Sequence, residues 1–168
     1  WAPEIHWISN RWYLYYTLNT NLDTGGVDRR GFVAESVGTS AMGPYVDRGI
    51  LFPDFWNIDG SVFMWNNQLF YLFSGEPVSG AQNIYIASMS NPYTLSGAPV
   101  LISAPTRSWE RIGTPDVNEG PWGFQRGGQL FVVYSASGCW TDDYTLGLLT
   151  LSNASPLDAS SWTKSGPV

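Results

Sequence analysis

The segment NRWYLYYT at residues 10–17 returns as NQLFYLFS at residues 67–74 and as GQLFVVYS at residues 128–135. Each copy begins with a turn-forming residue and a polar residue, continues with aromatic and aliphatic residues, and ends in Thr or Ser. The first residues of the copies, 10, 67 and 128, are 57 and 61 positions apart. Such runs favour strands, so the copies predict three equivalent strands within an internal repeat.

The sequence around each copy repeats as well. Two further strand-like segments follow each copy, and a segment that carries an acidic residue precedes it. The following segments start at residues 31, 83 and 144 (GFVAESV, NIYIASM, YTLGLLTL) and at residues 43, 96 and 160 (GPYVDRGILF, SGAPVLIS, SSWTKSGPV), and the preceding ones are WAPEIH (1–6), NIDGSVF (57–63) and NEGPWGF (118–124). The repeats therefore span about residues 1–56, 57–116 and 117–168, with four strand-like segments in each.

A repeat of about 50–60 residues with four strands is typical of the blade of a β-propeller. A β-sandwich would also contain many short strands. It would not explain why an acidic segment followed by two hairpins occurs three times in the same order. No window of a dozen residues has helical periodicity. The sequence therefore predicts an all-β protein, a β-propeller with about three four-stranded blades, and one partial propeller domain over residues 1–168.

Three blades are too few to close a ring, because propellers typically have about four to eight blades. Open edges would expose unpaired backbone groups and favour association. We therefore expect either that further blades are missing from this chain or that several chains complete one ring. The chain begins at Trp1 and stops at Val168 in mid-pattern, which favours the first expectation.

The composition excludes several classes of partner and site. Charged residues make up 13% of the chain, about half of the ~25% of an average soluble protein, and the net charge is −6. Eight Lys and Arg cannot form a stripe along a phosphate backbone, which excludes nucleic acid. No apolar run approaches the ~20 residues of a membrane-spanning helix. With Cys139 the only cysteine and His6 the only histidine, we expect no disulfide, no metal cluster and no catalytic thiol.

Each repeat opens with an acidic residue, namely Glu4, Asp59 or Glu119. The first strand of a propeller blade lines the central channel, so we expect three carboxylates at the same place in successive blades, around one axis. Neighbouring carboxylates raise one another's pKa values, and a pair with separated pKa values suits acid–base chemistry on a glycosidic bond. Alternatively, the acids cap turns or bond backbone amides, which the pair Asp59-Gly60 would also suit.

Four motifs carry a resemblance to a known family. WAPEIH (1–6), NRWYLYY (10–16), IDGSVF (58–63) and VNEGP (117–121), in this order and spacing, resemble glycoside hydrolase family 43, and so do IYIASMSNPYTL (84–95), SWE (108–110) and YSASGCWTDDYTLGLL (134–149). The resemblance covers nearly the whole chain and implies an inverting glycosidase on a five-bladed propeller. The chain is most similar to subgroups that release arabinofuranose from arabinan or arabinoxylan, with xylo-oligosaccharide as an alternative substrate.

The resemblance implies three catalytic carboxylates, of which this chain carries two. The family's general acid, the Glu of the EGP motif, maps to Glu119, and its pKa-modulating Asp maps to Asp59. Its general base, an Asp ahead of the WAPE segment, and its axial His in the last blade have no counterpart here. An inverting glycosidase needs the base about 6.5–9.5 Å from the acid, so we expect this chain alone to bind sugar weakly and to hydrolyse little or none. No cofactor is required, and a calcium ion on the propeller axis stays open.

Aromatic side chains offer sugars an apolar platform with a polar handle. The candidates for substrate contact, with Phe55 and Trp56 as the first choice, are Trp1, Phe55, Trp56, Trp122 and Trp140. Glu4 is expected to be structural or a peripheral contact of the pocket, and His6 to pack beside the same strand. Four Trp residues in or beside the blade strands are expected to pack between blades: Trp12, Trp65, Trp109 and Trp162.

Two other functions stay open besides an enzyme. A propeller without catalysis could bind carbohydrate as lectins do, or several three-blade chains could assemble into one structural or binding ring. The tripeptide Asn153-Ala154-Ser155 matches a glycosylation sequon and is weak evidence for a secreted, extracellular protein, although no signal peptide opens the chain. The charged residues from Asp23 to Arg30 are interpreted as a solvated loop.

Overall fold

The computed structural model describes residues 1–20, 28–77, 80–152 and 155–168. Asp23 of the expected loop and Asn153 and Ala154 of the sequon lie outside these ranges. The described residues are mostly in strands, with short 3₁₀ turns η2 (Ser108–Glu110) and η3 (Ala159–Ser161). No helix among them is long and apolar enough to cross a membrane.

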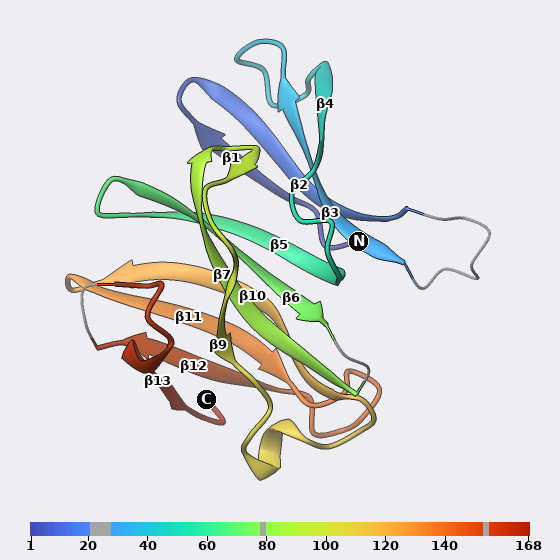
Figure 1. Cartoon of the computed structure of the whole chain (residues 1–168), viewed down its shortest axis with the longest axis vertical. Coiled ribbons are helices and arrows are strands. Elements are labelled where there is room, and N and C mark those ends of the chain that lie inside the picture. The colour runs from blue at the N-terminus through green and yellow to red at the C-terminus, as the bar shows by residue number, and fades with distance from the viewer. Residues whose placement is uncertain (21–27, 78–79, 153–154) are drawn as a thin grey trace.

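The strands fall into three successive blades, which follow one another along the long axis of the molecule in Figure 1. Their bounds are β1 (Glu4–Ile8), β2 (Arg11–Asn19), β3 (Arg29–Ser36) and β4 (Tyr45–Ile50) in blade 1; β5 (Trp56–Trp65), β6 (Gln68–Glu76), β7 (Ala81–Asn91), β8 (Thr94–Leu95) and β9 (Val100–Ser103) in blade 2; and β10 (Asp116–Arg126), β11 (Gln129–Ala136), β12 (Thr145–Leu151) and β13 (Trp162–Ser165) in blade 3. Blades 1 and 3 are four-stranded antiparallel meanders, and in blade 2 both β9 and the short β8 pair with β7. A short parallel pairing of β10 with β7 joins blades 2 and 3.

The same two-residue turn closes the first hairpin of every blade. The turn residues are Ser9-Asn10, Asn66-Asn67 and Gly127-Gly128, and all six have positive φ. Two consecutive residues with positive φ define the turn that matches the twist of paired strands, and Asn and Gly adopt this conformation at low cost. The Asn or Gly that opens each repeated segment is therefore the second residue of this turn.

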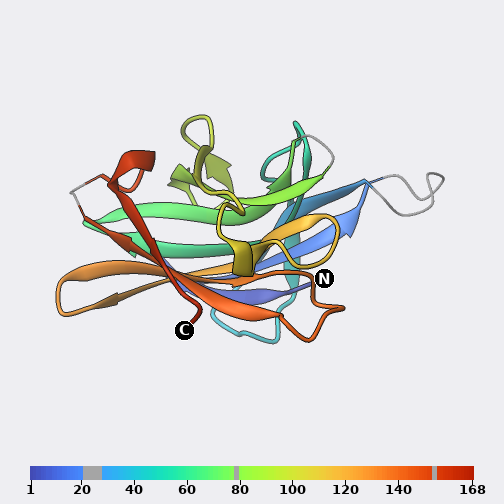
Figure 2. The ribbon, with the colours of Figure 1, turned by 90° about the horizontal axis from the view of Figure 1, so that it is seen from below.

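The middle blade is buried on both faces, and this creates two cores. On β6 every residue from Leu69 to Ser74 is buried, whereas burial alternates along β2 and β11. Leu69, Tyr71 and Phe73 pack with residues of blade 1, and Phe70 and Leu72 pack with residues of blade 3. In Figure 2 the sheet of blade 2 (green) lies beside that of blade 3 (orange to red). Because successive side chains of a strand point to opposite faces, one strand serves both cores.

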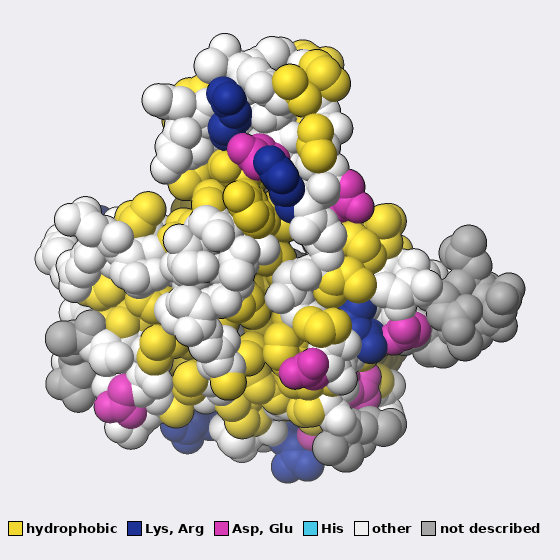
Figure 3. All heavy atoms as spheres, turned by 45° about the horizontal axis from the view of Figure 1, so that its top comes forward, with side chains coloured by type: hydrophobic (Ala, Val, Ile, Leu, Met, Phe, Trp, Pro, Cys, Tyr) yellow, Lys and Arg dark blue, Asp and Glu magenta, His cyan; other side chains and the backbone are white. Residues whose placement is uncertain are grey.

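The outer faces of blades 1 and 3 keep apolar side chains at the surface. Ile5 and Trp7 of blade 1 are 47% and 45% exposed, and Trp122 and Leu146 of blade 3 are 50% and 45% exposed. Figure 3 shows hydrophobic side chains spread over one face of the molecule, with few and scattered Lys and Arg. The sheets are thus those of an open, partial propeller, which confirms the expected all-β class. Blades 1 and 3 have the expected four strands, and blade 2 has the short strand β8 in addition.

One detail of the sequence interpretation is wrong. Arg29 and Arg30 belong to β3, where they pair with Asn19 and Leu18 of β2, rather than to a solvated loop. The pairing continues to Arg29 because long charged side chains can lie along a sheet surface with their charged ends in water. Arg30 also forms an ion pair with Asp28 at 2.5 Å.

Candidate active site

The first strand of blades 2 and 3 contains a bulge at the same place. Between β5 and β6 the register jumps from the pair Ile58–Ser74 to the pair Ser61–Leu72. Between β10 and β11 it jumps from Glu119–Ser135 to Trp122–Val133. A β-bulge inserts a residue into one strand, bends that strand and redirects the side chains around it.

Blade 1 continues the pattern ahead of β1. The N-terminal amino group of Trp1 donates to the Thr17 C=O at 2.8 Å, the Thr17 N–H donates to the Trp1 C=O at 3.1 Å, and Glu4 pairs with Tyr15. Residues 1–4, 58–61 and 119–122 are therefore equivalent four-residue segments. The second residue of each segment has positive φ: Ala2 (38°), Asp59 (56°) and Gly120 (56°).

The register corrects the expected equivalence of the three acids. Glu119 is the first residue of its segment, Asp59 is the second, and Glu4 is the fourth. All three acids lie in the bulge region, but each occupies a different position of the four-residue segment. A bulge redirects the side chains of several of its residues, so acids at different positions can still lie near one another. A glycine follows Asp59 because a Cβ at Gly60 would overlap the buried hydroxyl of Tyr71.

Two buried Asn side chains hold the bulges in place, and the sequence interpretation missed both. Asn57 and Asn118 are equivalent and fully buried. The Asn57 Oδ1 accepts the Gly31 N–H of blade 1 at 2.8 Å. The Asn118 Oδ1 accepts the Ser103 hydroxyl of blade 2 at 2.7 Å. Each Asn thus ties a first strand to the preceding blade, and its recurrence just ahead of each bulge was a usable signal.

Asp59 is linked directly to the neighbouring blade. Its Oδ2 accepts the backbone N–H of Gly120 at 3.0 Å. Burial raises the pKa of the Asp59 carboxyl above its usual value, and the nearby Glu4 charge adds to this, while the Gly120 bond opposes it. The link brings the second residues of two equivalent segments together across the boundary between blades 2 and 3.

Glu119 is half-buried and is held by one side chain. The Tyr144 hydroxyl donates to Glu119 Oε1 at 2.8 Å. Burial raises the pKa of the Glu119 carboxyl, and the Asp59 charge raises it further, while the Tyr144 bond opposes the rise. An acid whose pKa lies above the ordinary value keeps its proton closer to neutral pH, which is what a general acid requires.

A pocket of about 280 Å³ opens where the three first strands meet. Its lining comes from all three blades: Ala2, Pro3, Glu4, Asp59, Gly120 and Pro121. Glu4 Oε2 is bonded to His6 Nε2 at 2.8 Å, and the His6 ring packs edge-on against Tyr15. The structure thus brings Glu4 and Asp59 to one pocket, with Glu119 preceding the lining residue Gly120.

The aromatic candidates separate into packed and exposed residues. Phe55, the first choice for a sugar contact, is half-buried: its ring packs against Phe52, Phe73 and Tyr85 and borders the core between blades 1 and 2. Its contact with sugar stays a prediction. Trp56 begins β5, is half-buried, and pairs with Glu76.

The other candidates remain at the surface. Trp1 is 62% exposed, with the Arg29 guanidinium 3.5 Å from its ring centre. Trp122 stacks on Phe124, and Trp140, which is 58% exposed, lies over Gly113 and Gly138. Among the Trp residues expected to pack between blades, Trp65, Trp109 and Trp162 join the core between blades 2 and 3, whereas Trp12 contacts Trp7 on the outer side of blade 1.

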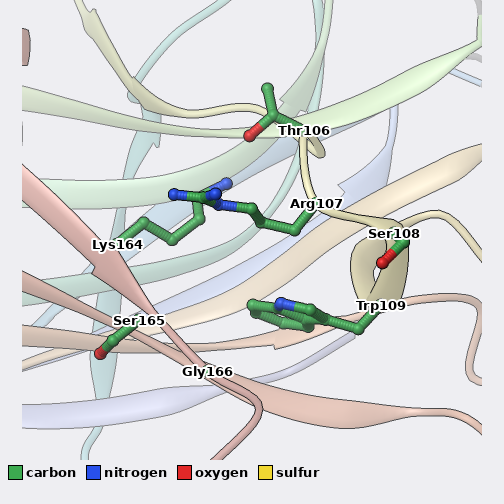
Figure 4. A pocket seen from close by; sticks show the side chains of 7 residues that line it. All are labelled: Thr106, Arg107, Ser108, Trp109, Lys164, Ser165 and Gly166. Atoms are coloured by element: carbon green, nitrogen blue, oxygen red, sulfur yellow. The ribbon is translucent and has the colours of Figure 1, made fainter.

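A larger pocket, of about 510 Å³, lies away from these carboxylates. Figure 4 shows its lining side chains from η2 and β13: Thr106, Arg107, Ser108, Trp109, Lys164, Ser165 and Gly166. Beneath it the fully buried Glu110 accepts hydrogen bonds from Lys164, Tyr134 and Asn118. Although burial alone would raise the pKa of Glu110, the hydrogen bonds from Lys164, from Tyr134 and from the backbone N–H groups of Arg107 and Thr106 hold it below its usual value. The ion pair between Glu110 and Lys164 links η2 to blade 3, and the repeat pattern of the sequence does not predict it.

No group of three or more His, Cys, Asp or Glu side chains within residues 1–20, 28–77, 80–152 and 155–168 is placed to hold a metal ion. The polar side chains that line the pocket are the carboxyl groups of Glu4 and Asp59. Burial raises the pKa of the neighbouring Glu119, and Asp59 lies close enough for its charge to raise that pKa as well.

The three blades define a partial β-propeller whose first strands bring Asp59 and Glu119, two carboxyl groups of raised pKa, to neighbouring positions. Comparison with known proteins identifies the group within this class. The chain belongs to glycosyl hydrolases family 43, whose family model matches residues 1–168.

Individual relatives agree with the family. The chain is 40% identical to an extracellular exo-alpha-(1->5)-L-arabinofuranosidase of Streptomyces avermitilis and 39% identical to alpha-L-arabinofuranosidase 43 of Humicola insolens. Each alignment covers 98% of this chain but 35% of the relative, so the chain spans about a third of their length. The crystal structure of an alpha-L-arabinofuranosidase from Lactobacillus brevis matches with a TM-score of 0.87 and 34% identity, over 98% of this chain and 54% of that one.

Proposed function

We propose that this chain is part of the catalytic propeller domain of a glycosidase that hydrolyses α-L-arabinofuranosyl linkages with inversion. The observation that carries the proposal is the pair Asp59 and Glu119 on neighbouring first strands, where burial and the Asp59 charge both raise the pKa of Glu119. Glu119 is assigned as the general acid, and Asp59 as the residue that tunes its pKa and orientation.

In the proposed reaction, the Glu119 proton passes to the glycosidic oxygen as the bond from that oxygen to the anomeric carbon breaks. Water attacks the anomeric carbon from the opposite face and gives its proton to a general base. Glu119 is left as a carboxylate and regains its proton from solvent. No residue of the chain is assigned as this base, so the chain is proposed to supply the acid side of the site.

The substrate is proposed to be arabinan or arabinoxylan, outside the cell. The support is that relatives at 39–40% identity are named as α-L-arabinofuranosidases and that one of them is named as extracellular. The exposed rings of Trp1, Trp122 and Trp140 are assigned as candidate sugar platforms, because exposed aromatic faces can stack on the apolar faces of sugars.

The proposal is tested with the full-length gene product and p-nitrophenyl α-L-arabinofuranoside. We expect release of p-nitrophenol, with NMR showing the β-anomer as the first sugar product. Glu119→Gln removes the transferable proton and should lower kcat by about 10²–10⁴-fold on arabino-oligosaccharides, the usual contribution of general acid catalysis. Arg126→Gln is a surface control on the same strand and should leave kcat unchanged.

A second candidate function is carbohydrate binding without catalysis. It is favoured by one observation, the exposed rings of Trp1, Trp122 and Trp140, which can stack on sugars without any chemical step. Saturable binding of arabino-oligosaccharides by the full-length gene product, without turnover of any arabinofuranoside, would establish this function and rule out the enzyme.

A further inference from the structure

Tyr144 is the side chain bonded to the proposed acid, although it lies 25 positions further along the chain. Its hydroxyl donates to Glu119 Oε1 at 2.8 Å. Tyr144 directly precedes β12, whose first residues pair with Ala136 and Ser135 of β11. Ser135 in turn pairs with Glu119 of β10. The side chain of Tyr144 therefore reaches across β11 to the first strand.

The Tyr144 hydroxyl is protonated whenever it could act. Ser135 of β11 lies between the two strands that the Tyr144–Glu119 bond connects. Burial raises the pKa of Tyr144 to about 12, and the charges of Glu119 and Cys139 raise it as well. The phenol therefore keeps its proton at all pH values at which a glycosidase of this kind would work, and it remains a donor.

This bond distinguishes the two oxygens of Glu119. When the carboxyl is protonated, the oxygen that accepts a hydrogen bond is favoured as the carbonyl oxygen, because the hydroxyl oxygen is the poorer acceptor. With Oε1 occupied by Tyr144, the proton resides on Oε2. The other titratable group that acts on Glu119 is Asp59 of β5, while Asp142 and Asp143 line the same surface pocket as Tyr144.

We infer that Tyr144 is a positioning residue that fixes the Glu119 carboxyl through Oε1 and so presents a proton on Oε2 to the leaving oxygen of an arabinofuranoside. The inference rests on the proposed role of Glu119 as the general acid. Tyr144 does not exchange a proton in this scheme; it selects which oxygen of the acid donates one.

The first experiment needs no activity. The carboxyl carbon of Glu119 in the 168-residue chain is titrated by ¹³C NMR in the wild type, Tyr144→Phe and Tyr45→Phe. Tyr144→Phe removes a bond that favours the ionised form, so the pKa of Glu119 should rise. Tyr45→Phe removes a surface bond from a Tyr hydroxyl to the Ala41 carbonyl oxygen and should leave it unchanged. An unchanged or lower pKa in Tyr144→Phe would overturn the inference.

A second variant guards against a folding defect. 3-Fluorotyrosine at position 144 keeps the ring and the hydroxyl but makes the hydroxyl a stronger donor to Glu119 Oε1, so the pKa of Glu119 should fall. If Tyr144→Phe loses its dispersed amide spectrum, the titration of the fluorotyrosine variant decides the matter, and no shift in that variant would overturn the inference.

The second experiment uses turnover by the full-length gene product. Tyr144→Phe should lower kcat about tenfold on an arabino-oligosaccharide, a part of the ~10²–10⁴-fold effect of the acid itself, with little change in KM. On a dinitrophenyl arabinofuranoside, whose leaving group needs no proton, kcat should hardly change. Equal losses on both substrates would show a merely structural tyrosine and contradict the inference. If the wild type shows no turnover, the proposed function is contradicted instead. The NMR titration still tests whether Tyr144 bonds to Glu119.

Discussion

The backbone N–H of Gly120 donates to Oδ2 of Asp59 at 3.0 Å, and this bond joins equivalent bulge positions of two adjacent blades. Because Gly120 directly follows Glu119, the bond also sets how far the two carboxyls lie from each other. The geometry of the acid site is therefore a property of the boundary between blades 2 and 3. Any change that moves blade 2 relative to blade 3 should therefore alter the distance between the Asp59 and Glu119 carboxyl groups.

Asp59→Asn should lower the pKa of Glu119. The Asp59 charge raises that pKa, and Asn removes the charge while its Oδ1 can still accept the Gly120 N–H. A lower pKa ionises the acid at lower pH, so the basic limb of the pH–rate profile of the full-length gene product should move towards acid. Asp116→Asn, on the same strand as Glu119, is the control and should leave the limb in place. A shift towards alkaline pH would contradict the assigned role of Asp59.

The 168-residue chain by itself should release no measurable p-nitrophenol from p-nitrophenyl α-L-arabinofuranoside. The reason is that none of its residues is assigned to activate water on the face opposite Glu119. The measurement is an end-point assay against a buffer blank, with folding checked by near-ultraviolet circular dichroism. Robust turnover that disappears in Glu119→Gln would mean that the base lies within this chain.

Lys164→Met should destabilise the chain by about 3 kcal/mol, because removing one partner of a buried ion pair leaves an uncompensated charge. The Glu110 side chain is 0% exposed and that of Lys164 is 12% exposed, with Nζ 2.7 Å from Oε1. Urea unfolding followed by Trp fluorescence measures the difference. Arg111→Met breaks the exposed pair with Asp116 and should cost at most about 1 kcal/mol. Equal losses in the two variants would contradict a buried role for Lys164.

The same pair should make the chain sensitive to acid. The pKa of Glu110 is lowered in the folded state, so its contribution to stability is present above the unfolded pKa and is lost as pH falls through the folded value. Wild-type stability should therefore fall on acidification more steeply than that of a Glu110→Gln, Lys164→Met double variant. Urea unfolding at several pH values below 5 provides the comparison, and parallel curves would argue against it.

Gly60→Ala should destabilise the chain by about 1–3 kcal/mol, the usual cost of overfilling a packed core. The added methyl group would overlap the Tyr71 hydroxyl, which is buried between blades 1 and 2. Tyr71→Phe in the same chain should recover part of the loss, because it removes the atom that the methyl group meets. Gly38→Ala is the control, since nothing lies within 4 Å of a Cβ there. A neutral Gly60→Ala would show that β5 can shift away from β6.

Local patterns in the sequence predicted the elements of the fold. The Asn and Gly residues at 10, 67 and 128 occupy the second position of three identical turns, and the runs that follow them are β2, β6 and β11. These features depend on backbone preferences and on side-chain alternation within a few residues, so a repeat in sequence becomes a repeat in structure. Asp59 and Glu119 could be selected as candidates because each lies just ahead of such a run.

The tertiary structure alone decided how these residues meet. Glu4, Asp59 and Glu119 seemed equivalent along the chain, and only the strand register shows that they hold three different positions in the bulge. Phe55 packs against the core between blades 1 and 2, and Glu110 forms an ion pair with Lys164, which lies 54 positions further along the chain. Tyr144 bonds to Glu119 across β11, which lies between their strands. Contacts of this kind depend on pairing, burial and blade packing between distant segments, which no local pattern contains.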